Sequence, residues 1–547
     1  MIPLRKPHFI FNDDGDGLKM VPLPHVEAKV TAPIEYLKGT PVDCFCWMVA
    51  AEVASYDSKV LQTIYDLYDK SEQSVVEFDG KKTDLPHTLY RQGIDYLPIL
   101  IRRTHELDKI FYASFRMNDV HHKSIPHGPL AGDFFNNNPQ YRLWGETDAA
   151  SCYNAGMDYA FPEVRRRKLE AICEVATKYD VDGIELDFSR EPYFFQPDEA
   201  WSNRGILTGF IRDVHKSLDR IGADRKRRIG LMIRTMFGED RLTHGGMDVR
   251  QWIGDNLMDV LVMTDWSNDC NREVQPWLGL CRQRSLGFYA AVECSQRIDR
   301  RNFYDFVENP DAPSHNYGFT QSPEQRILCP RAVAQNFLAQ GVDGIYLFNH
   351  TPRPTPDEYF NPMGQRPKLP LSEWGSIETL RCLDKQYLFW TGLPIYAEAL
   401  RPPRFHQTIK FATHGPDIGN GDSQVVLRFR QMVRRFPHVA PYQQPPFVKP
   451  GYVMYTLNGK LIPEELIERK RQESGRIPSG FKLGEHELIE IHLTGTALRS
   501  GENSLSFEIP VPNEPRERDP YVYIYELELD VRFGGVQPVY TLETKQP

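Results

Sequence analysis

Short runs of β-branched and aromatic residues alternate with helical segments over the first two thirds of the chain. Apolar residues recur at helical spacing in 162–178, which begins with a proline, in 207–221, and in 322–340, which Gly341 ends. This alternation is typical of a parallel sheet whose strands are joined by crossover helices. Eight strand-like runs are present: 9–11, 42–47, 110–115, 183–188, 229–234, 260–264, 287–293 and 344–348.

The number of runs separates two parallel architectures. Eight strands with helical crossovers over about 350 residues predict a (β/α)8 TIM barrel with long loops after its strands. The alternative is a doubly wound open sheet, which usually carries a glycine-rich GxGxxG turn after its first strand. Residues 12–17 read Asn-Asp-Asp-Gly-Asp-Gly and do not match that turn. We therefore expect an α/β fold with a barrel domain at 1–395.

The last third of the chain has a different pattern. A single hydrophobic core stops growing at roughly 250–300 residues, so a chain of 547 residues needs a second domain. Asn458-Gly459 and Ser500-Gly501 predict hairpin turns, and 463–473 predicts a helical insertion. The whole pattern predicts a β-sandwich at 396–547. Its strand-like runs are 408–412, 424–429, 452–457, 488–493, 504–509 and 521–531.

Composition limits the partners. A net charge of -9 argues against a general nucleic-acid binder. No run approaches the roughly 20 apolar residues that a membrane span needs, and no signal peptide is visible. We therefore expect neither a nucleic-acid nor a membrane partner, and a cytoplasmic location, or a periplasmic or secreted one if a leader has been removed. Nine cysteines without a CxxC pair indicate free thiols. A homo-oligomer remains open.

The fourth run carries the strongest catalytic candidates. Side chains alternate along a strand, so Glu185 and Asp187 point to the same side, into the barrel mouth, where TIM-barrel active sites lie. Buried carboxylates are costly unless they are paired or used, and adjacent carboxylates push their pKa values apart, as acid–base chemistry requires. A charge network that only braces the barrel is the alternative.

A second carboxylate is needed across the mouth. Glycoside hydrolysis uses two carboxyl groups that flank the scissile bond: one protonates the leaving oxygen, and the other attacks or activates water. Glu293 ends the seventh run and is the main candidate to partner Asp187. Asp265 ends the sixth run and is the rival, with a loop cap as its structural alternative.

Polar and aromatic residues near the other strand ends are candidates for substrate binding. The arginines predict recognition of a glycan with carboxylate or sulfate groups, unless they neutralise the rim's own carboxylates. The aromatic side chains are candidate stacking platforms for sugar rings. No ligand spacing typical of zinc occurs, so we expect no metal and no cofactor. The candidates are Arg116, Asn118, Asp119, His121, His122, Arg190, Tyr193, Arg234, Asn349, Trp47 and Trp266.

Three segments carry a resemblance to a known family. Asp182-Gly-Ile-Glu-Leu-Asp187, Gly341-Val-Asp-Gly-Ile-Tyr-Leu-Phe-Asn349 and Phe115-Arg-Met-Asn-Asp119 together resemble bacterial TIM-barrel proteins described as glycoside hydrolase-like, akin to family 10 glycosyl hydrolases. The resemblance covers roughly residues 9–350 and implies hydrolysis of a poly- or oligosaccharide. Residues 457–460 and 498–503 are similar to jelly-roll domains found beside such barrels, and we favour a buttressing role for this domain.

The resemblance implies roles for the carboxylates. In retaining enzymes of the larger barrel clan the acid/base follows strand four and the nucleophile lies on strand seven, which Asp187 and Glu293 match by position. In the alpha-galactosidase-like arrangement Asp187 would be the nucleophile and Asp265 the acid. Strand four also resembles the chitinase-type DGxDxDxE signature, with Glu185 for the middle Asp and Ser189 for the acid Glu, which argues against substrate-assisted chemistry.

The sequence thus predicts a glycosidase that uses Asp187 and Glu293, with Glu185 and Asp265 supporting or replacing them. A retaining mechanism is preferred on the clan positions. Two alternatives stay open: a non-catalytic glycan-binding protein on a degenerate barrel, which Ser189 favours, and a polysaccharide lyase in which a histidine or tyrosine abstracts a proton.

Overall fold

The computed structural model describes twelve stretches of the chain. They comprise residues 4–19, 26–70, 85–120, 130–143, 156–265, 268–293, 324–349, 370–389, 406–434, 453–476, 482–508 and 521–534.

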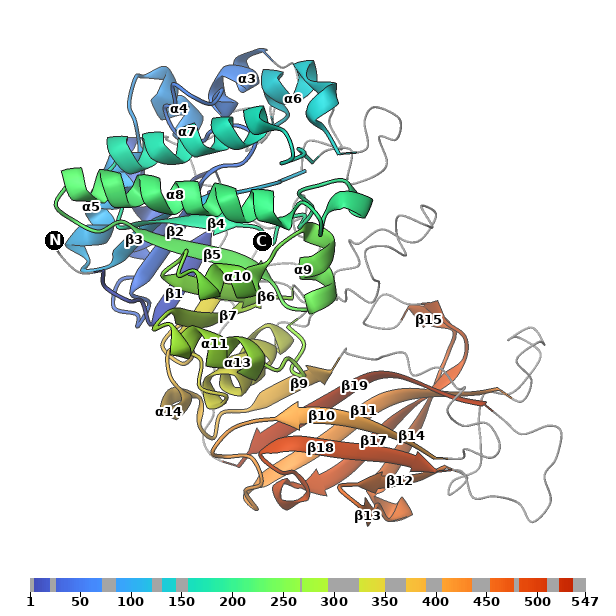
Figure 1. Ribbon diagram of the computed structural model, residues 1–547. Coiled ribbons are helices and arrows are strands. Elements are labelled where there is room, and N and C mark those ends of the chain that lie inside the picture. The colour runs from blue at the N-terminus through green and yellow to red at the C-terminus, as the bar shows by residue number, and fades with distance from the viewer. Residues whose placement is uncertain are drawn as a thin grey trace.

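The first part of the chain folds into a closed barrel of eight parallel strands (Figure 1). Strand β1 pairs in parallel with β2 and also with β8, which closes the sheet. The TIM-barrel prediction is confirmed, and each predicted strand-like run coincides with one barrel strand. The strands are β1 (Phe9–Asp13), β2 (Cys44–Ala50), β3 (Ile110–Arg116), β4 (Gly183–Asp187), β5 (Gly230–Met236), β6 (Val260–Thr264), β7 (Gly287–Glu293) and β8 (Gly344–Phe348).

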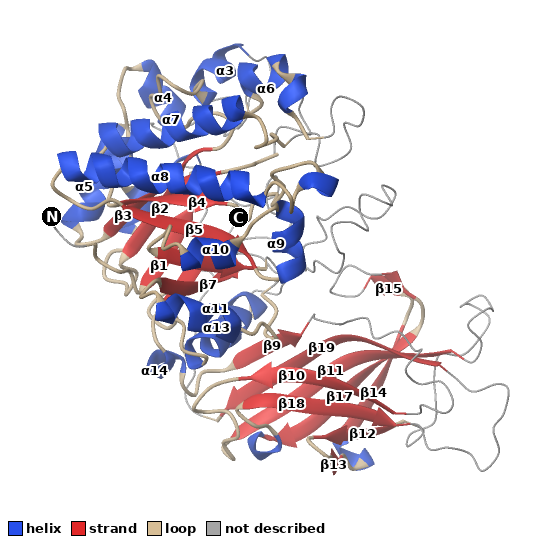
Figure 2. Ribbon diagram, viewed as in Figure 1, coloured by secondary structure: helices blue, strands red, loops and turns tan. Residues whose placement is uncertain are grey.

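Helices surround the barrel on its outside (Figure 2). The long helices α7 (Pro162–Lys178) and α8 (Arg204–Asp224) cover β4 and β5 and bury one apolar face each. Among the described helices, none has the length and apolar content to cross a bilayer. The others are α1 (Asp16–Lys19), α2 (Ala32–Glu35), α3 (Ile64–Lys70), α4 (Leu85–Arg91), α5 (Leu97–Glu106), α6 (Gly132–Asn137), α9 (Glu239–Gly245), α10 (Val249–Gly254), α11 (Gln275–Gln283), α13 (Gln325–Ala339) and α14 (Ile377–Leu380).

The barrel interior is packed rather than open. At its N-terminal end the rings of Tyr112 and Tyr289 fill the space beside glycines that begin neighbouring strands. A Cβ atom at Gly183 would lie 2.2 Å from the Tyr112 ring, so this strand can begin only with glycine. The opposite end of the barrel is lined by polar side chains, which form the candidate site.

Trp47 is not at the barrel mouth. Strand alternation directs Cys44 and Cys46 into the barrel, and therefore directs Trp47 outward into the layer between strands and helices. Its ring is 1% exposed, and its indole nitrogen lies 3.3 Å from the hydroxyl oxygen of Tyr96 on the helix side. The prediction that Trp47 stacks a sugar ring was wrong, because the ring packs in the core.

The last part of the chain forms a β-sandwich, as predicted. One sheet has the order β10-β18-β12-β13 and the other β14-β17-β11-β19-β9, and their facing side chains meet in one core. Phe429 of one sheet lies 5.4 Å, between ring centroids, from both Tyr455 and Phe507 of the other. The strands are β9 (Lys385–Phe389), β10 (His406–Thr413), β11 (Ser423–Arg434), β12 (Met454–Leu457), β13 (Lys460–Leu461), β14 (Ile467–Gln472), β17 (His486–Thr494), β18 (Gly501–Glu508) and β19 (Tyr521–Phe533), beside a separate β15–β16 ribbon (Gly475–Arg476 and Lys482–Leu483).

Of three local predictions for the sandwich, one is confirmed and two are wrong. Asn458-Gly459 forms the expected hairpin turn between β12 and β13, with both residues at positive φ. The prediction of a helical insertion at 463–473 was wrong. Six of these residues form β14 and pair with β17, and this pairing outweighs their helix propensity. Ser500-Gly501 is no hairpin turn either, since β17 and β18 belong to different sheets.

The sandwich is joined to the barrel through α13. Asn336 of this helix donates to the Ala412 carbonyl at 2.9 Å and accepts from the His414 amide at 2.7 Å. Strand β9 lies before the expected boundary at residue 395, yet it pairs with β19 of the sandwich. The ion pair between Lys385 of β9 and Asp417, at 2.9 Å, is fully buried. These contacts fit the buttressing role that we favour for the second domain.

Candidate active site

Two carboxylates and one arginine meet at the C-terminal end of the barrel. Asp187 ends β4, Glu293 ends β7, and Arg234 lies on β5 in direct register with Asp187. One terminal nitrogen of Arg234 lies 3.1 Å from Oδ2 of Asp187, and the other lies 2.7 Å from Oε1 of Glu293. A single guanidinium therefore contacts the two main catalytic candidates at the same end of the barrel.

Arg234 is enclosed by the barrel. Its side chain has no solvent exposure, and its guanidinium carbon lies 4.0 Å from the ring centroid of Phe348 and 5.3 Å from that of Tyr346. Burial alone lowers the pKa of Arg234, but the neighbouring Asp187 and Glu293 more than offset this and raise it. The side chain thus stays charged and keeps both carboxylates in place. The sequence predicted that Arg234 binds substrate, whereas in the structure its donors are directed to these two residues.

Asp187 is surrounded by donors. Its Oδ1 accepts from the backbone amide of Ser189 at 2.9 Å and from the Ser189 hydroxyl at 2.6 Å, while Oδ2 accepts from Arg234. These donors compensate the negative charge of Asp187. Ser189 entered the sequence analysis only as a departure from the chitinase pattern. Strand alternation could have assigned it to the side of Asp187, because the two residues are two positions apart.

Glu293 lies in a tighter environment. Its Oε1 accepts from Thr264 at the end of β6 as well as from Arg234. Asn268 fixes the backbone on both sides, since its side chain accepts from the Glu293 amide at 2.8 Å and donates to the Glu293 carbonyl at 3.0 Å. Burial raises the pKa of Glu293, although Arg234 and Thr264 act in the opposite direction. Sequence reasoning missed Thr264 and Asn268.

Glu185 lies one layer below this pair. It has no solvent exposure, and its Oε2 accepts from the Cys46 thiol at a sulfur–oxygen distance of 3.1 Å. Burial, together with the charge of Asp187, raises its pKa. Asp187 and Glu293 keep 3% and 6% of their side chains exposed, so they can touch a ligand where Glu185 cannot. The sequence predicted that Glu185 supports or replaces the catalytic pair. Because its side chain is fully buried beneath Asp187 and Glu293, it cannot replace either of them in contact with a substrate.

Asp265 braces the loop after β6. Its Oδ1 accepts from the Asn268 amide at 3.1 Å, and its Oδ2 lies 2.7 Å from Nε of Arg272. Both oxygens are thus occupied by the chain itself. Of the two candidate partners of Asp187, Glu293 shares an arginine with it and Asp265 does not.

Arg116 is neutralised by the rim's own carboxylates. It ends β3, in register with Asp187, and its terminal nitrogens form ion pairs with Asp14 and Asp119. Arg234 is held between two carboxylates in the same way. Of the three arginines predicted to bind the substrate, Arg116 and Arg234 are therefore compensated by carboxylates of the chain, as the alternative interpretation of these arginines expected.

Asn118 is a structural brace. Its amide nitrogen donates to the carbonyls of Met157 at 3.0 Å and of Tyr193 at 2.6 Å, and its oxygen accepts from the Met157 amide at 2.8 Å. Both of its donors are used, so the prediction that Asn118 binds substrate was wrong. Tyr193 is buried beside it, and its carbonyl is held by this contact.

The remaining binding candidates stay predictions. Arg190 is buried after β4, with Nε 4.0 Å from Oε2 of Glu191. The Asn349 amide donates to the Asn12 carbonyl at 3.0 Å where β8 meets β1, and Asn349 adopts a positive φ of 53°. His121, His122 and Trp266 lie outside the described residues.

One group of described side chains has distances that a metal ion could bridge. It consists of Glu468, Glu490 and His492 on the sandwich. Glu490 is already bound there by Arg428 and Lys470. The group belongs to the sandwich and not to the barrel, so it does not bear on the candidate active site.

No protein-family model matches the sequence, and no curated protein matches it either. Several solved structures match this chain at low similarity. A cycloisomaltooligosaccharide glucanotransferase from Paenibacillus sp. is 9% identical with a TM-score of 0.34. The match covers 95% of this chain and 57% of the glucanotransferase chain. A noncanonic maltogenic alpha-amylase from Thermotoga neapolitana is 11% identical with a TM-score of 0.34, over 92% of this chain and 99% of the other. The PgaB (BpsB) glycoside hydrolase domain from Bordetella bronchiseptica is 10% identical with a TM-score of 0.37, over 63% and 94%.

This chain thus spans little more than half the length of the Paenibacillus enzyme. Similarity at this level does not carry an activity from these proteins to this chain.

Proposed function

We propose that this protein hydrolyses glycosidic bonds with Asp187 and Glu293 as its two working carboxylates. The observation that carries the proposal is that one buried guanidinium, Arg234, contacts both side chains at the C-terminal end of a TIM barrel. Active sites of this fold lie at that end, and glycoside hydrolysis needs two carboxyl groups on either side of the bond. No cofactor takes part in this chemistry.

The surroundings of the two carboxylates support opposite roles. Glu293 has a pKa raised by burial, so it keeps a proton to higher pH and suits the general acid. Asp187 accepts from Ser189 and Arg234, and these donors support a negative charge, which suits a nucleophile or a general base. This assignment is the reverse of the one that the clan positions imply. A retaining mechanism with these roles would make Asp187 the nucleophile.

The substrate that fits best is an uncharged poly- or oligosaccharide. Arg116 and Arg234 are both compensated by carboxylates of the chain, and a ligand that carried carboxylate or sulfate groups would meet Asp187 as a like charge. The earlier hypothesis of an anionic glycan therefore loses its main support among the described residues.

A non-catalytic glycan-binding protein is the second candidate. The same Arg234 contacts would neutralise two buried carboxylates in a barrel that had lost its activity. The two functions differ in turnover: a binding protein retains the glycan unchanged, whereas a hydrolase releases shorter products.

Product analysis tests the proposal. The wild-type protein would be incubated with neutral, uronate and sulfated glycans, and the products would be identified by mass spectrometry, which separates hydrolysis from the unsaturated products of a lyase. Asp187→Asn and Glu293→Gln should each slow cleavage by about 10²-fold to 10⁴-fold. Asp219→Asn, at an exposed carboxylate on α8, is the control and should behave as wild type. Cleavage of a neutral glycan that survives in both site variants would overturn the assignment.

A further inference from the structure

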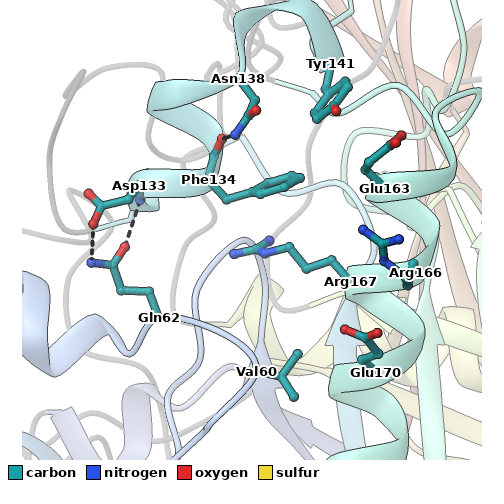
Figure 3. Close-up of a pocket in the computed structure, with 10 residues that line it drawn as sticks. All are labelled: Val60, Gln62, Asp133, Phe134, Asn138, Tyr141, Glu163, Arg166, Arg167 and Glu170. Atoms are coloured by element: carbon teal, nitrogen blue, oxygen red, sulfur yellow. Dashed lines mark hydrogen bonds between the residues drawn. The ribbon is translucent and has the colours of Figure 1, made fainter.

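A pocket lies on the outside of the barrel. It has a volume of about 620 Å³ and opens between α6, with the turn that follows it, and the exposed face of α7 (Figure 3). This volume falls within the roughly 300–1,000 Å³ that is typical of small-ligand sites. None of the catalytic candidates lines it.

One wall of this pocket is aromatic. Phe134 projects from α6 towards α7 (Figure 3), and the Tyr141 ring lies 5.9 Å from it, between centroids, at an interplanar angle of 28°. The guanidinium of Arg167 lies 4.4 Å from the Phe134 centroid and is itself fixed by Glu52 at 2.7 Å. The two rings are therefore held in place, as a stacking platform requires.

The facing wall has unused polar groups. Glu163, Arg166 and Glu170 lie three and four residues apart on α7 and share the face that lines the pocket. None of the three makes a hydrogen bond or ion pair to another residue in the described part of the chain. Arg166 and Glu170 have the i,i+4 spacing of a helical ion pair, but their side chains do not form one. The pocket thus offers carboxylate acceptors and guanidinium donors to which no other described side chain is bound.

The opposite side of the pocket is rigid. Gln62 donates to the Asp133 carboxylate at 2.9 Å and accepts from the Asp133 amide at 2.7 Å, which ties the chain before α3 to the start of α6 (Figure 3). The pocket is therefore formed without a ligand, and a ligand would not have to order it.

These features point to one class of ligand. Carboxylates on the lining exclude a strongly anionic ligand, while Arg166 and Arg167 disfavour a cationic one. The many polar groups exclude a purely apolar ligand. Hydroxyl groups can donate to Glu163 and Glu170 and accept from Arg166, and the C–H face of a sugar ring can stack on Phe134. We propose that this pocket is a second binding site for an uncharged oligosaccharide.

The position of the pocket connects it to the proposed catalytic site. Lys168, which follows Arg167 on α7, donates to the Ala51 carbonyl at 2.7 Å, just after β2, and to the Arg116 carbonyl at 3.5 Å, at the end of β3. Helix α7 thus joins the pocket directly to the catalytic end of the barrel. In this respect the inference rests on the proposed function: the pocket would hold a distant segment of the same glycan.

Binding is measured separately from cleavage. The probes are neutral hexasaccharides of glucose, xylose and N-acetylglucosamine, and their affinity for the full-length Asp187→Asn protein is measured by ligand-observed NMR and calorimetry. Phe134→Ala and Arg166→Ala are then combined with Asp187→Asn. Removal of the stacking ring should weaken binding about tenfold. Arg166→Lys should restore part of the affinity that Arg166→Ala loses.

The controls separate this site from a folding defect and from the catalytic site. Lys216→Ala removes an exposed cation from the neighbouring helix α8 and should not change the affinity. Arg166 is exposed, so its variant keeps the fold even if Phe134→Ala does not.

The inference is overturned if no probe binds the Asp187→Asn protein. It is also overturned if Phe134→Ala and Arg166→Ala both leave the affinity of that protein unchanged. Binding that depends on Phe134 in a protein without hydrolase activity would support the pocket and reject the proposed function. Hydrolysis by the wild-type protein, together with unchanged binding in both pocket variants, would support the proposed function and reject the pocket.

Discussion

Glu293 Oε1 lies 2.7 Å from a terminal nitrogen of Arg234, although β6 separates the strands of the two residues in the barrel. Thr264 of the intervening strand donates to the same oxygen. The contact spans three strands at one level of the barrel, and Arg234 extends it to Asp187 on β4. Arg234 and Thr264 therefore fix the carboxylate of Glu293 from two other strands of the barrel.

Removal of this arginine should destabilise the barrel. Arg234→Met deletes the charge while it keeps an unbranched apolar side chain, and leaves two buried carboxylates uncompensated. Breaking a buried ion pair in this way lowers the free energy of unfolding by about 3–5 kcal/mol, which urea unfolding near pH 7 would measure. The loss should shrink in acid, where the carboxylates are neutral. An equal loss at both pH values would contradict the charge-pair explanation.

Ser189→Ala should lower activity without a large loss of stability. It removes the 2.6 Å hydroxyl contact to Asp187 but keeps the backbone contact at 2.9 Å. We expect a loss of about 0.5–1.5 kcal/mol in stability and a decrease of about tenfold in kcat. Ser189→Thr retains a hydroxyl and is the matched control. The role of Ser189 in positioning Asp187 is rejected if both variants match wild type in kcat.

The buried carboxylates predict how stability depends on pH. Burial raises the pKa of Glu185 above the ordinary value of 4.5 that it regains in the unfolded chain. In the window between these two values the folded state binds more protons, so the contribution of Glu185 to stability falls as pH rises. Glu185→Gln removes this contribution. Unfolding free energies measured across this window should therefore fall less steeply with pH in the variant. An unchanged slope would show that Glu185 does not titrate there.

Two ion pairs of the sandwich give a prediction with an internal control. Lys385 and Asp417 form a pair with no exposure, whereas Lys410 and Glu502 form a pair in which the side chains are 69% and 64% exposed. Lys385→Met should lower the unfolding free energy by about 3–5 kcal/mol and Lys410→Met by about 0–1 kcal/mol. Calorimetry would measure both. Similar effects of the two substitutions would contradict the view that burial decides the strength of these pairs.

Most of the fold follows from local patterns. The eight strand-like runs coincide with the barrel strands because each is short, apolar and bounded by helix or turn signals. Two elements of the sandwich did not follow in this way. Strand β14 consists largely of good helix formers and is extended only because β17 pairs with it, and β9 is a short run inside the expected barrel domain.

The candidate site was predictable in part. Alternation along β4 and the fold rule brought Asp187 and Glu293 to one end of the barrel. The partners of Arg116, Arg234 and Asn118 come from distant segments, so their sequence neighbours gave no sign that these side chains serve the protein rather than a ligand. Trp47 was misassigned because a strand pattern gives two faces without saying which one faces the mouth.

The central claim is that Asp187 and Glu293 share the work of hydrolysis in opposite roles. The most direct test compares Asp187→Asn and Glu293→Gln on a cleaved glycan and on an aryl glycoside of the same sugar whose phenol is acidic enough to leave without protonation. Both variants should lose about 10²-fold to 10⁴-fold in rate on the glycan. Only Glu293→Gln should recover on the aryl glycoside, because only the acid becomes dispensable. Recovery of Asp187→Asn instead would reverse the roles, and wild-type rates in both variants would contradict the claim.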